Sequence, residues 1–486
     1  GIYFRSGALE CEGGVVALFS GQGSQYVGMG TELANTFPTY LESVESMDKQ
    51  FIDADLPRLS ETVFPIPVFD KEGESANTKA LQPTPCAQPG IGTFSTGTYK
   101  IFAKAGFKPD FVAGHSFGEL TALWAAGVYG ENDFYALAKA RGEAMAAPDD
   151  ADFDAGTMAA VIGDVANLSE HLEDFSEVVI ANYNSLSQVV IAGAKDAIEK
   201  ASAFLKEKGY KVVALPVSAA FHTSLVGHAQ VPFAEAIDAV KFKKAKIPVY
   251  SNSSGEAYPT TVKSIRGVLK EHILNSVRFT DELKNIHAAG GRIFVEFGPK
   301  KVLAPMVDSV LEGKGHLAIS VNPNPKKSSD LQLRLAAIQL AVAGVSLSNL
   351  DPFAAEKPIY NTTKPSPLKI RLSAQNYLSE GFVQKRDAIL DDGFTFSTAT
   401  PEVIEKVVSA PESGGGVPGA TAAFRGSGDG LEQGLALFYQ HERATLKIHE
   451  QYLETPKQYA DTFQALMQQQ LSITQTNPGA TMAEGV

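Results

Sequence analysis

Residues 110–128 have the sequence DFVAGHSFGELTALWAAGV, which decides the class of fold. The segment opens with the short apolar run 110–113, passes through the pentapeptide GHSFG at 114–118, and continues with helical apolar spacing to a stop at Gly130. A buried strand, a sharp turn and a helix in this order are typical of an α/β protein. We therefore expect the serine of the pentapeptide to project from the carboxyl edge of a sheet.

Outward from this segment, two α/β patterns are nested in the sequence. Residues 15–19 predict a buried strand and residues 83–105 a buried helix, and the same rhythm resumes at Val249 and at residues 293–297. A second pattern occupies residues 156–218. Its predicted elements are the strand 158–162, the helix 167–175, the strands 178–181 and 188–192, the helix 196–208 and the strand 211–216. The order βαββαβ is that of a ferredoxin-like unit.

The expected fold is therefore α/β, with a large parallel-sheet subdomain like that of the α/β-hydrolases, an inserted ferredoxin-like subdomain, and a C-terminal linker and helix. The expected regions are 1–13 (N-terminal linker remnant), 14–155 and 219–320 (large subdomain), 156–218 (small subdomain), 321–372 (proline-rich surface connector) and 373–486 (acidic linker region with a helix near 431–453). Within the last region, Gly, Pro and Ser are enriched over residues 411–430, which predicts flexibility there.

Length and composition limit the possible functions. The 486 residues are 44% hydrophobic, which is enough for one large core or two to three smaller ones. The net charge of −13 argues against nucleic-acid binding, and residues 373–486 carry about half of it, with 14 acidic against 7 basic side chains. No apolar run predicts a membrane span. The cysteines, Cys11 and Cys86, fit a reducing cytoplasm, and a start at Gly1 without a leader leads us to expect a chain cut from a longer polypeptide.

The pentapeptide 114–118 matches the G-x-S-x-G pattern of a nucleophilic serine. Glycines on both sides leave space on a strained turn, and the N-terminus of the following helix favours developing negative charge. The alternative is a purely structural turn from strand to helix. On this pattern, Ser116 is the candidate nucleophile.

A serine of this kind needs a base, and His222 is the best placed of the nine histidines. It follows a predicted strand, at the point where the small subdomain returns to the large one. A loop histidine without a catalytic role is the alternative interpretation. No Asp or Glu evidently orients His222, so a backbone carbonyl could do so. His115 is adjacent to Ser116, but we expect its side chain to point elsewhere on the turn.

Two further signals concern the substrate. Residues 21–25 (GQGSQ) follow the first strand, and their glycines allow backbone N–H groups to approach an oxyanion; a plain turn is the alternative. Arg141 lies among small apolar residues one helix beyond the serine, where its guanidinium suits a carboxylate. The alternative is a surface arginine whose stem lies along the protein. His441 and His449 lack the carboxylate or Cys cluster of a metal site, so we expect no metal.

Six stretches together resemble the malonyl-CoA:acyl carrier protein transacylases and the acyltransferase domains of type I polyketide and fatty acid synthases. In the family's order they are 19–30 (FSGQGSQYVGMG), 109–127 (PDFVAGHSFGELTALWAAG), 140–145 (ARGEAM), 181–193 (ANYNSLSQVVIAG), 216–224 (PVSAAFHTS) and 294–303 (FVEFGPKKVL). The resemblance covers about residues 14–320. The sequences of these motifs are most similar to those of the acyltransferase domain of polyunsaturated fatty acid synthases.

The resemblance implies a role for each matching residue. Ser116 would form the acyl-enzyme, and His222 would serve as its general base and acid. The backbone N–H groups of Gln22 and Phe117 would form the oxyanion hole. Arg141 would form a bidentate pair with the free carboxylate of malonyl.

The resemblance also implies the surroundings of these residues. A backbone carbonyl in the segment from Asn275 to Arg278 would orient the histidine. The substrate pocket would be lined by His115, Met145, Asn182, Asn184 and Phe221. In such synthases a Phe before the histidine accompanies malonyl and a Ser accompanies methylmalonyl, because the ring leaves little room for an extra methyl group.

Substrate and partners follow from the same resemblance. It implies malonyl-CoA as donor, the phosphopantetheine thiol of an acyl carrier protein as acceptor, no bound cofactor, and a synthase with a ketosynthase upstream and carrier domains downstream. We expect no nucleic-acid or membrane partner. Two alternatives remain: a thioesterase or esterase, with water as acceptor, and a non-catalytic scaffold domain. Arg141 and the Gln22 loop favour the transferase, and the presence of both Ser116 and His222 disfavours the scaffold.

Overall fold

A computed structural model of the chain describes residues 13–148, 153–217, 219–348, 350, 384, 387 and 388. The chain divides into two units, Gly1–Pro365 and Ser366–Val486. In the second unit, the described residues are helical and exposed. The predictions for residues 1–12 and for the helix near 431–453 lie outside the described residues, as does most of the predicted linker.

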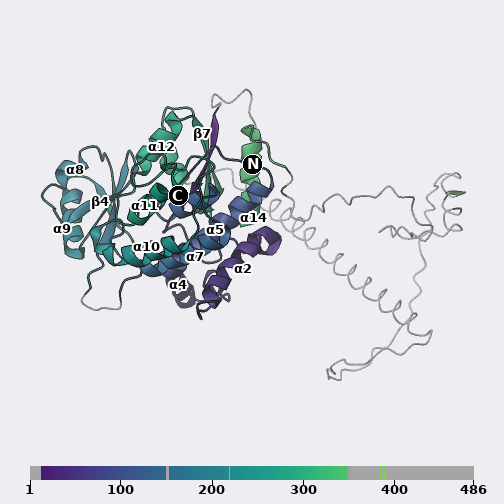
Figure 1. The fold of residues 1–486 in the computed structure, drawn as a ribbon, viewed down its shortest axis with the longest axis horizontal. Coiled ribbons are helices and arrows are strands. Elements are labelled where there is room, and N and C mark those ends of the chain that lie inside the picture. The colour runs from purple at the N-terminus through teal and green to yellow at the C-terminus, as the bar shows by residue number, and fades with distance from the viewer. Residues whose placement is uncertain are drawn as a thin grey trace, which may run out of the picture. The chain divides into compact units, whose positions relative to one another are not determined.

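The first unit contains two sheets and the helices around them (Figure 1). Its elements in chain order are β1 (Gly14–Phe19), α1 (Thr31–Thr36), α2 (Pro38–Ile52), α3 (Leu59–Val63), α4 (Lys71–Ala80), α5 (Thr84–Lys104), β2 (Phe111–Gly114), α6 (Gly118–Ala125), α7 (Glu131–Ala144), β3 (Thr157–Ile162), α8 (Leu168–His171), β4 (Val178–Ser185), β5 (Gln188–Gly193), α9 (Lys195–Glu207), β6 (Lys211–Ala214), η1 (Ser224–Ala229), α10 (Gln230–Ala239), α11 (Val262–Glu271), α12 (Phe279–Ala288), β7 (Gly291–Pro299), α13 (Leu303–Val310), β8 (Leu317–Asn322) and α14 (Ser329–Val342). Of the helices in the described ranges, none is long and apolar enough to cross a bilayer.

The larger sheet is parallel and has the strand order β2-β1-β7-β8. Alternate residues of β1 point to opposite faces, as the period of a strand requires. Ala17 and Phe19 pack in one core with residues of α5 and α14, whereas Val16 and Leu18 pack in another with residues of α12 and α13. Helices thus cover both faces, which explains why β1 and β2 carry no polar side chains. The predicted strands and helix at 15–19, 110–113, 293–297 and 83–105 correspond to β1, β2, β7 and α5.

The smaller sheet is antiparallel and has the strand order β4-β5-β3-β6. Its elements follow one another as β3-α8-β4-β5-α9-β6, the predicted βαββαβ order. Helices α8 and α9 lie beside it at the left of Figure 1, and they share with it a separate core that includes Val161, Ile191 and Leu205. The predicted α/β fold with a ferredoxin-like insertion is therefore confirmed, while the boundaries at residues 156 and 218 stay predictions.

Main-chain hydrogen bonds join the smaller sheet to a segment of the large subdomain. Val277, between α11 and α12, donates its N–H to Ala181 O at 2.8 Å and accepts from Tyr183 N–H at 2.8 Å. Thr280 adds a side-chain bond to Tyr183 O at 3.0 Å. These bonds fix the edge strand β4 of the small sheet against the segment that enters α12. Groups carried by the two subdomains can therefore keep a constant spacing.

The prediction of a surface connector over residues 321–372 is wrong for its first part. Helix α14 packs on β8 and buries Leu333 and Leu340 completely. Pro323 and Pro325 lie in the loop between β8 and α14, where the absence of their backbone N–H groups breaks no regular hydrogen bond. The prolines therefore mark a turn into a regular helix and do not prevent one.

The start of α13 depends on one buried carboxylate. Glu296 on β7 is 1% exposed and accepts from the backbone N–H groups of Val302 and Leu303, both at 2.8 Å, and of Ala304 at 3.2 Å. Burial raises the pKa of Glu296, and the three N–H bonds oppose that rise. These donors are the ones that the first turn of a helix leaves unpaired.

We expect Glu296→Ala to lower the free energy of unfolding by about 3 kcal/mol, because it leaves three buried donors without an acceptor. Chemical denaturation measures this loss. The control is Glu312→Ala, at an exposed position shortly after the same helix. A loss for Glu296→Ala no larger than that of the control would show that water replaces the carboxylate.

Candidate active site

Ser116 lies on the turn between β2 and α6. Its φ is 52°, in the left-handed region that residues with a side chain rarely adopt. Close approach of the main chain explains both flanking glycines. A Cβ on Gly114 would overlap the main chain at Gly118, and a Cβ on Gly118 would overlap the Phe19 carbonyl. Glycine at 114 allows the turn to close on itself, and glycine at 118 allows it to pass this close to β1.

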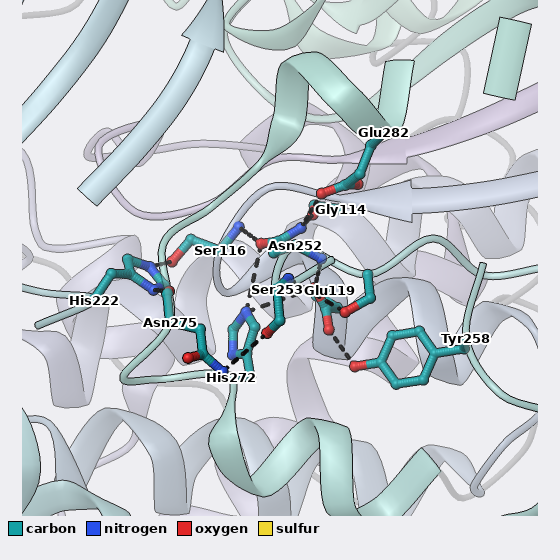
Figure 2. A network of polar contacts seen from close by, with 11 residues as sticks. Gly114, Ser116, Glu119, His222, Asn252, Ser253, Tyr258, His272, Asn275 and Glu282 are labelled. Atoms are coloured by element: carbon teal, nitrogen blue, oxygen red, sulfur yellow. Dashed lines mark hydrogen bonds and ion pairs between the residues drawn. The ribbon is translucent and has the colours of Figure 1, made fainter. Parts of the chain in front are cut away.

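A histidine from the other end of the insertion meets this serine. Ser116 Oγ lies 2.7 Å from His222 Nε2, and His222 Nδ1 lies 2.9 Å from Asn275 O (Figure 2). A carbonyl oxygen can only accept, so Nδ1 carries the proton and Nε2 accepts from the serine hydroxyl. This is the tautomer that a general base requires. The expected backbone partner of His222 is thus Asn275, whereas Arg278 donates its backbone N–H to Asn252 O and pairs its side chain with Asp281.

Burial and a nearby cation keep this histidine neutral. His222 is 3% exposed, and burial together with the charge of Arg141 lowers its pKa from 6.5 to about 3. His115 contributes to the same lowering, and the bond to Asn275 O opposes it. A neutral imidazole at every ordinary pH is available to accept a proton from the serine.

Arg141 extends from α7 into the core and is 1% exposed. Its Nη1 donates to Gln88 Oε1 at 2.8 Å, while Nε and Nη2 have no partner in the described part of the chain. Burial lowers the pKa of Arg141 to about 9, and the charge of Glu119 opposes this. The guanidinium carbon lies 5.9 Å from the ring centre of Phe117, the residue after the serine. The surface position that was the alternative is thus excluded.

Gln88, on α5, connects Arg141 to the Gln22 loop. Its Nε2 donates to Gln22 Oε1 at 3.2 Å and lies 3.6 Å from Met145 Sδ. Because Arg141 donates to the other end of the same carboxamide, Gln88 links the buried cation to the wall of the cavity above Ser116. Gln88 was not among the residues predicted from the sequence, since a glutamine within a helix carries no distinguishing pattern.

The loop after β1 lies directly against the serine turn. A Cβ on Gly21 would overlap the His115 carbonyl, so the glycine is required for this approach. In the described part of the chain, the backbone N–H groups of Gln22 and Phe117 donate to no protein acceptor. An oxyanion hole consists of backbone N–H groups of this kind, which are free to donate to a negative oxygen beside the serine. Lys300 Nζ donates to Gly23 O at 3.2 Å and ties the loop to the end of β7.

A cavity of about 240 Å³ opens over Ser116 between the two subdomains. It is lined by Gly21, Gln22, Gly23, His115, Ser116, Met158, Ala160, Asn182, Asn184, Gln188, Val190, Leu215, Val217, Phe221, His222, Val302 and Met306. Of the predicted pocket residues, Met145 alone lies outside this lining. Phe117 and Arg141 are also buried outside it. The small sheet therefore covers the serine with side chains of β3, β4 and β5.

His115 does not compete for the serine proton. Its Nε2 lies 2.7 Å from Asn184 Oδ1, so this nitrogen donates to the carboxamide, and burial lowers the pKa of the imidazole. The expectation that the side chain points away from the hydroxyl agrees with this bond. Across the described ranges, no group of three or more His, Cys, Asp or Glu side chains is arranged to hold a metal ion.

A serine on a strand-to-helix turn, paired with a neutral histidine beneath a second sheet, is the arrangement of an enzyme that passes an acyl group through a serine ester. Residues 16–349 match the family model described as acyl transferase domain. The chain belongs to this acyl transferase family.

Relatives and solved structures agree with this assignment. One subunit of the polyunsaturated fatty acid synthase of Thraustochytrium sp. is 38% identical over 403 residues, which are 81% of this chain and 14% of that protein. Malonyl CoA-acyl carrier protein transacylase of Bacillus subtilis is 35% identical over 314 residues, which are 63% of this chain and 93% of the transacylase. The crystal structure of the acyltransferase domain from the second module of the salinomycin polyketide synthase superposes with a TM-score of 0.62 at 29% identity, over 73% of this chain and 79% of that one. The chain thus spans nearly all of the transacylase and a small part of the synthase protein.

We expect the reactivity of Ser116 toward a sulfonyl fluoride to change by less than about twofold between pH 7.5 and pH 5.5, because a histidine with a pKa of about 3 stays unprotonated over this range. A histidine with the usual pKa near 6.5 would lose about tenfold. Mass spectrometry of the labelled protein measures the rate, and Ser116→Ala serves as the unlabelled control. A midpoint near pH 6.5 would contradict the neutral state assigned to His222.

Proposed function

We propose that this chain transfers malonyl from malonyl-CoA, through an ester on Ser116, to the phosphopantetheine thiol of an acyl carrier protein. The observation that carries the proposal is the 2.7 Å contact between Ser116 Oγ and His222 Nε2, with His222 held by Asn275 O. The names of the relatives, a malonyl CoA-acyl carrier protein transacylase and part of a polyunsaturated fatty acid synthase, support the donor and the acceptor.

In the first half-reaction, Ser116 Oγ attacks the thioester carbonyl carbon while its proton passes to His222 Nε2. The bond from His222 Nδ1–H to Asn275 O stabilises the imidazolium that forms. The carbonyl oxygen becomes negative and accepts from the N–H groups of Gln22 and Phe117. The tetrahedral intermediate then collapses, the C–S bond breaks, and His222 returns the proton to the sulfur as the thiol of CoA leaves.

The second half-reaction reverses these roles with a new thiol. His222 accepts the proton of the phosphopantetheine thiol, and the sulfur attacks the carbonyl carbon of the Ser116 ester. The ester C–O bond breaks, and the proton passes from His222 back to Ser116 Oγ. The two half-reactions together leave the enzyme unchanged, which is the pattern of ping-pong kinetics.

Arg141 supports malonyl as the acyl group. A buried guanidinium whose Nε and Nη2 find no partner within the described ranges gains two charge-assisted hydrogen bonds from a carboxylate. Arg141 is close enough to the site to lower the pKa of His222. Phe221, which lines the cavity beside the histidine, would limit the space at the α-carbon. An acyl group without a carboxylate leaves the cation unpaired and is disfavoured.

The proposed setting is a multidomain polyunsaturated fatty acid or polyketide synthase in the cytoplasm, with a ketosynthase upstream and carrier domains downstream. The Thraustochytrium relative, which aligns with 81% of this chain, is by name a subunit of such a synthase. The aligned part is only 14% of that protein. The two cysteines are few enough for a reducing compartment.

Labelling with radioactive malonyl-CoA tests the transfer. We expect the wild-type chain to retain label after denaturation, to pass it to an acyl carrier protein in excess over the malonate released, and Ser116→Ala to retain none. Predominant release of malonate would instead make the protein a thioesterase. A wild-type chain that retains no label, although it folds, would leave only the scaffold interpretation.

We expect Arg141→Ala to lower the rate of malonyl loading by at least about 100-fold, because two charge-assisted hydrogen bonds to the carboxylate are lost. Acetyl loading should be unchanged or faster, since the buried cation that disfavours it is removed. Initial rates with the two acyl-CoA donors give the ratio, and Arg334→Ala on α14 is the matched control. An equal loss for both donors would remove Arg141 from carboxylate recognition.

A further inference from the structure

A buried asparagine lies directly beneath the serine turn. Asn252 is 1% exposed and follows a segment that runs beside β2, where Val249 forms a parallel bridge with Val112 and Tyr250 N–H donates to Val112 O at 3.0 Å. Because neighbouring parallel segments end at the same edge of a sheet, Asn252 arrives where β2 delivers Ser116.

The side chain of Asn252 binds both ends of the turn. Its Oδ1 accepts the backbone N–H of Ser116 at 2.6 Å, and its Nδ2 donates to Gly114 O at 2.6 Å. The second hydrogen of Nδ2 is donated to Glu282 Oε1, also at 2.6 Å. Figure 2 shows the carboxamide between the serine turn and Glu282. One side chain thus forms hydrogen bonds with the main-chain groups on either side of His115, Gly114 O and Ser116 N–H.

The backbone N–H and carbonyl groups of Asn252 are themselves hydrogen-bonded to other parts of the chain. Its N–H donates to Glu119 Oε2 at 2.6 Å, and its carbonyl accepts from Arg278 N–H at 2.8 Å. Tyr258 OH donates to the other oxygen of Glu119. His272 Nε2 lies 3.4 Å from Asn252 Oδ1. The position of the carboxamide is therefore set by the first turn of α6, by the segment that enters α12 and by His272, as well as by the serine turn that it binds.

We infer that Asn252 is a positioning residue for acyl transfer: it holds Ser116 in the left-handed conformation that aims Oγ at His222. The inference rests on the proposed role of Ser116 as the nucleophile, but not on the identity of the acyl group. A left-handed residue other than glycine persists only when surrounding contacts impose it. The bonds of Asn252 to Ser116 N–H and Gly114 O are such contacts.

The chemistry of the site requires a carboxamide. The turn presents a donor, Ser116 N–H, and an acceptor, Gly114 O, so the side chain between them must accept with one atom and donate with the other. A carboxylate of the same shape accepts twice and would face Gly114 O and Glu282 with negative charge. An alanine makes neither bond and leaves the buried N–H and carbonyl groups unpaired.

We expect Asn252→Ala to lower the rate constant of Ser116 acylation by malonyl-CoA about 100-fold, the usual effect of misplacing a reacting group by about 1 Å, with KM changed less than about threefold. The rate of sulfonylation of Ser116 by a sulfonyl fluoride should fall by a similar factor. The control is Asn285→Ala, which removes from α12 the carboxamide of an exposed residue that donates to Gly255 O at 2.9 Å. It should leave both rates within about twofold of the wild type.

Asn252→Asp separates positioning from packing, because it keeps the shape of the side chain. The titratable groups around residue 252 are Glu119, Glu282 and His272, with Tyr258 behind Glu119 and with Arg141, His222 and His115 farther away. When protonated, the aspartic acid offers one acceptor for Ser116 N–H and one donor for Gly114 O, and it lacks only the second donor that asparagine gives to Glu282. Relative to wild type, we therefore expect its sulfonylation rate to fall by at least about tenfold as pH rises from 5.5 to 8.5, whereas the ratio for Asn252→Ala stays constant.

The outcomes are distinguishable. If Asn252→Ala folds, as judged by circular dichroism, and keeps both rates within about twofold of the Asn285→Ala control, the inference is wrong. If Asn252→Ala does not fold, Asn252→Asp decides, and a flat ratio across the pH range would overturn the inference. If sulfonyl fluoride labels the wild type but malonyl-CoA does not, the proposed substrate fails while the role of Asn252 is still tested by sulfonylation.

Discussion

The left-handed conformation of Ser116 is the constraint on which the site depends. It lifts the hydroxyl out of the end of β2, and it exists only because neighbouring parts of the chain impose it. Gly114 lets the turn close on the start of α6, Gly118 lets it approach the end of β1, and Asn252 binds the turn from below. The glycines lie on the turn itself, whereas Phe19 and Asn252 come from two other segments that end at the same edge of the parallel sheet. The topology of the sheet therefore places the serine before any substrate binds.

A second constraint is the burial of the groups around Ser116 and His222. His222 and Arg141 are both almost fully buried, which makes the charged state of each more costly, and the charge of Arg141 lowers the pKa of His222 further. The result is a histidine that stays neutral and a cation whose Nε and Nη2 have no partner among the described residues. A net charge of −13 for the whole chain gives no hint of this, because the local field in a low-dielectric site is set by the nearest groups. The acidity of the whole protein therefore says nothing about the charge near Ser116, where Arg141 is a buried cation.

Sequence reasoning succeeded where a pattern is local. The strand, turn and helix around residues 110–128 and the order of the insertion at 156–218 are repeated in the structure, because apolar periodicity reports which face of an element is buried. It failed where the deciding contact is distant in the chain. Proline spacing at 321–372 suggested an irregular connector, yet α14 forms there because the parallel sheet offers it an apolar surface. Gln88 and Asn252 were missed because only the fold brings them to the serine.

The sequence alone determined that this protein has an α/β fold with a ferredoxin-like insertion, and it identified Ser116, His222 and Arg141 as candidates, since glycine spacing and family motifs are properties of the chain order. Only the tertiary structure decided which carbonyl holds the histidine, that Arg141 is buried with free donors, and that one carboxamide supports the turn. Hydrogen bonds act over about 3 Å, and the partners here are separated by 53 to 138 positions in the chain. No local sequence pattern can specify a contact between residues so far apart in the chain, so these contacts are fixed by the packing of the fold.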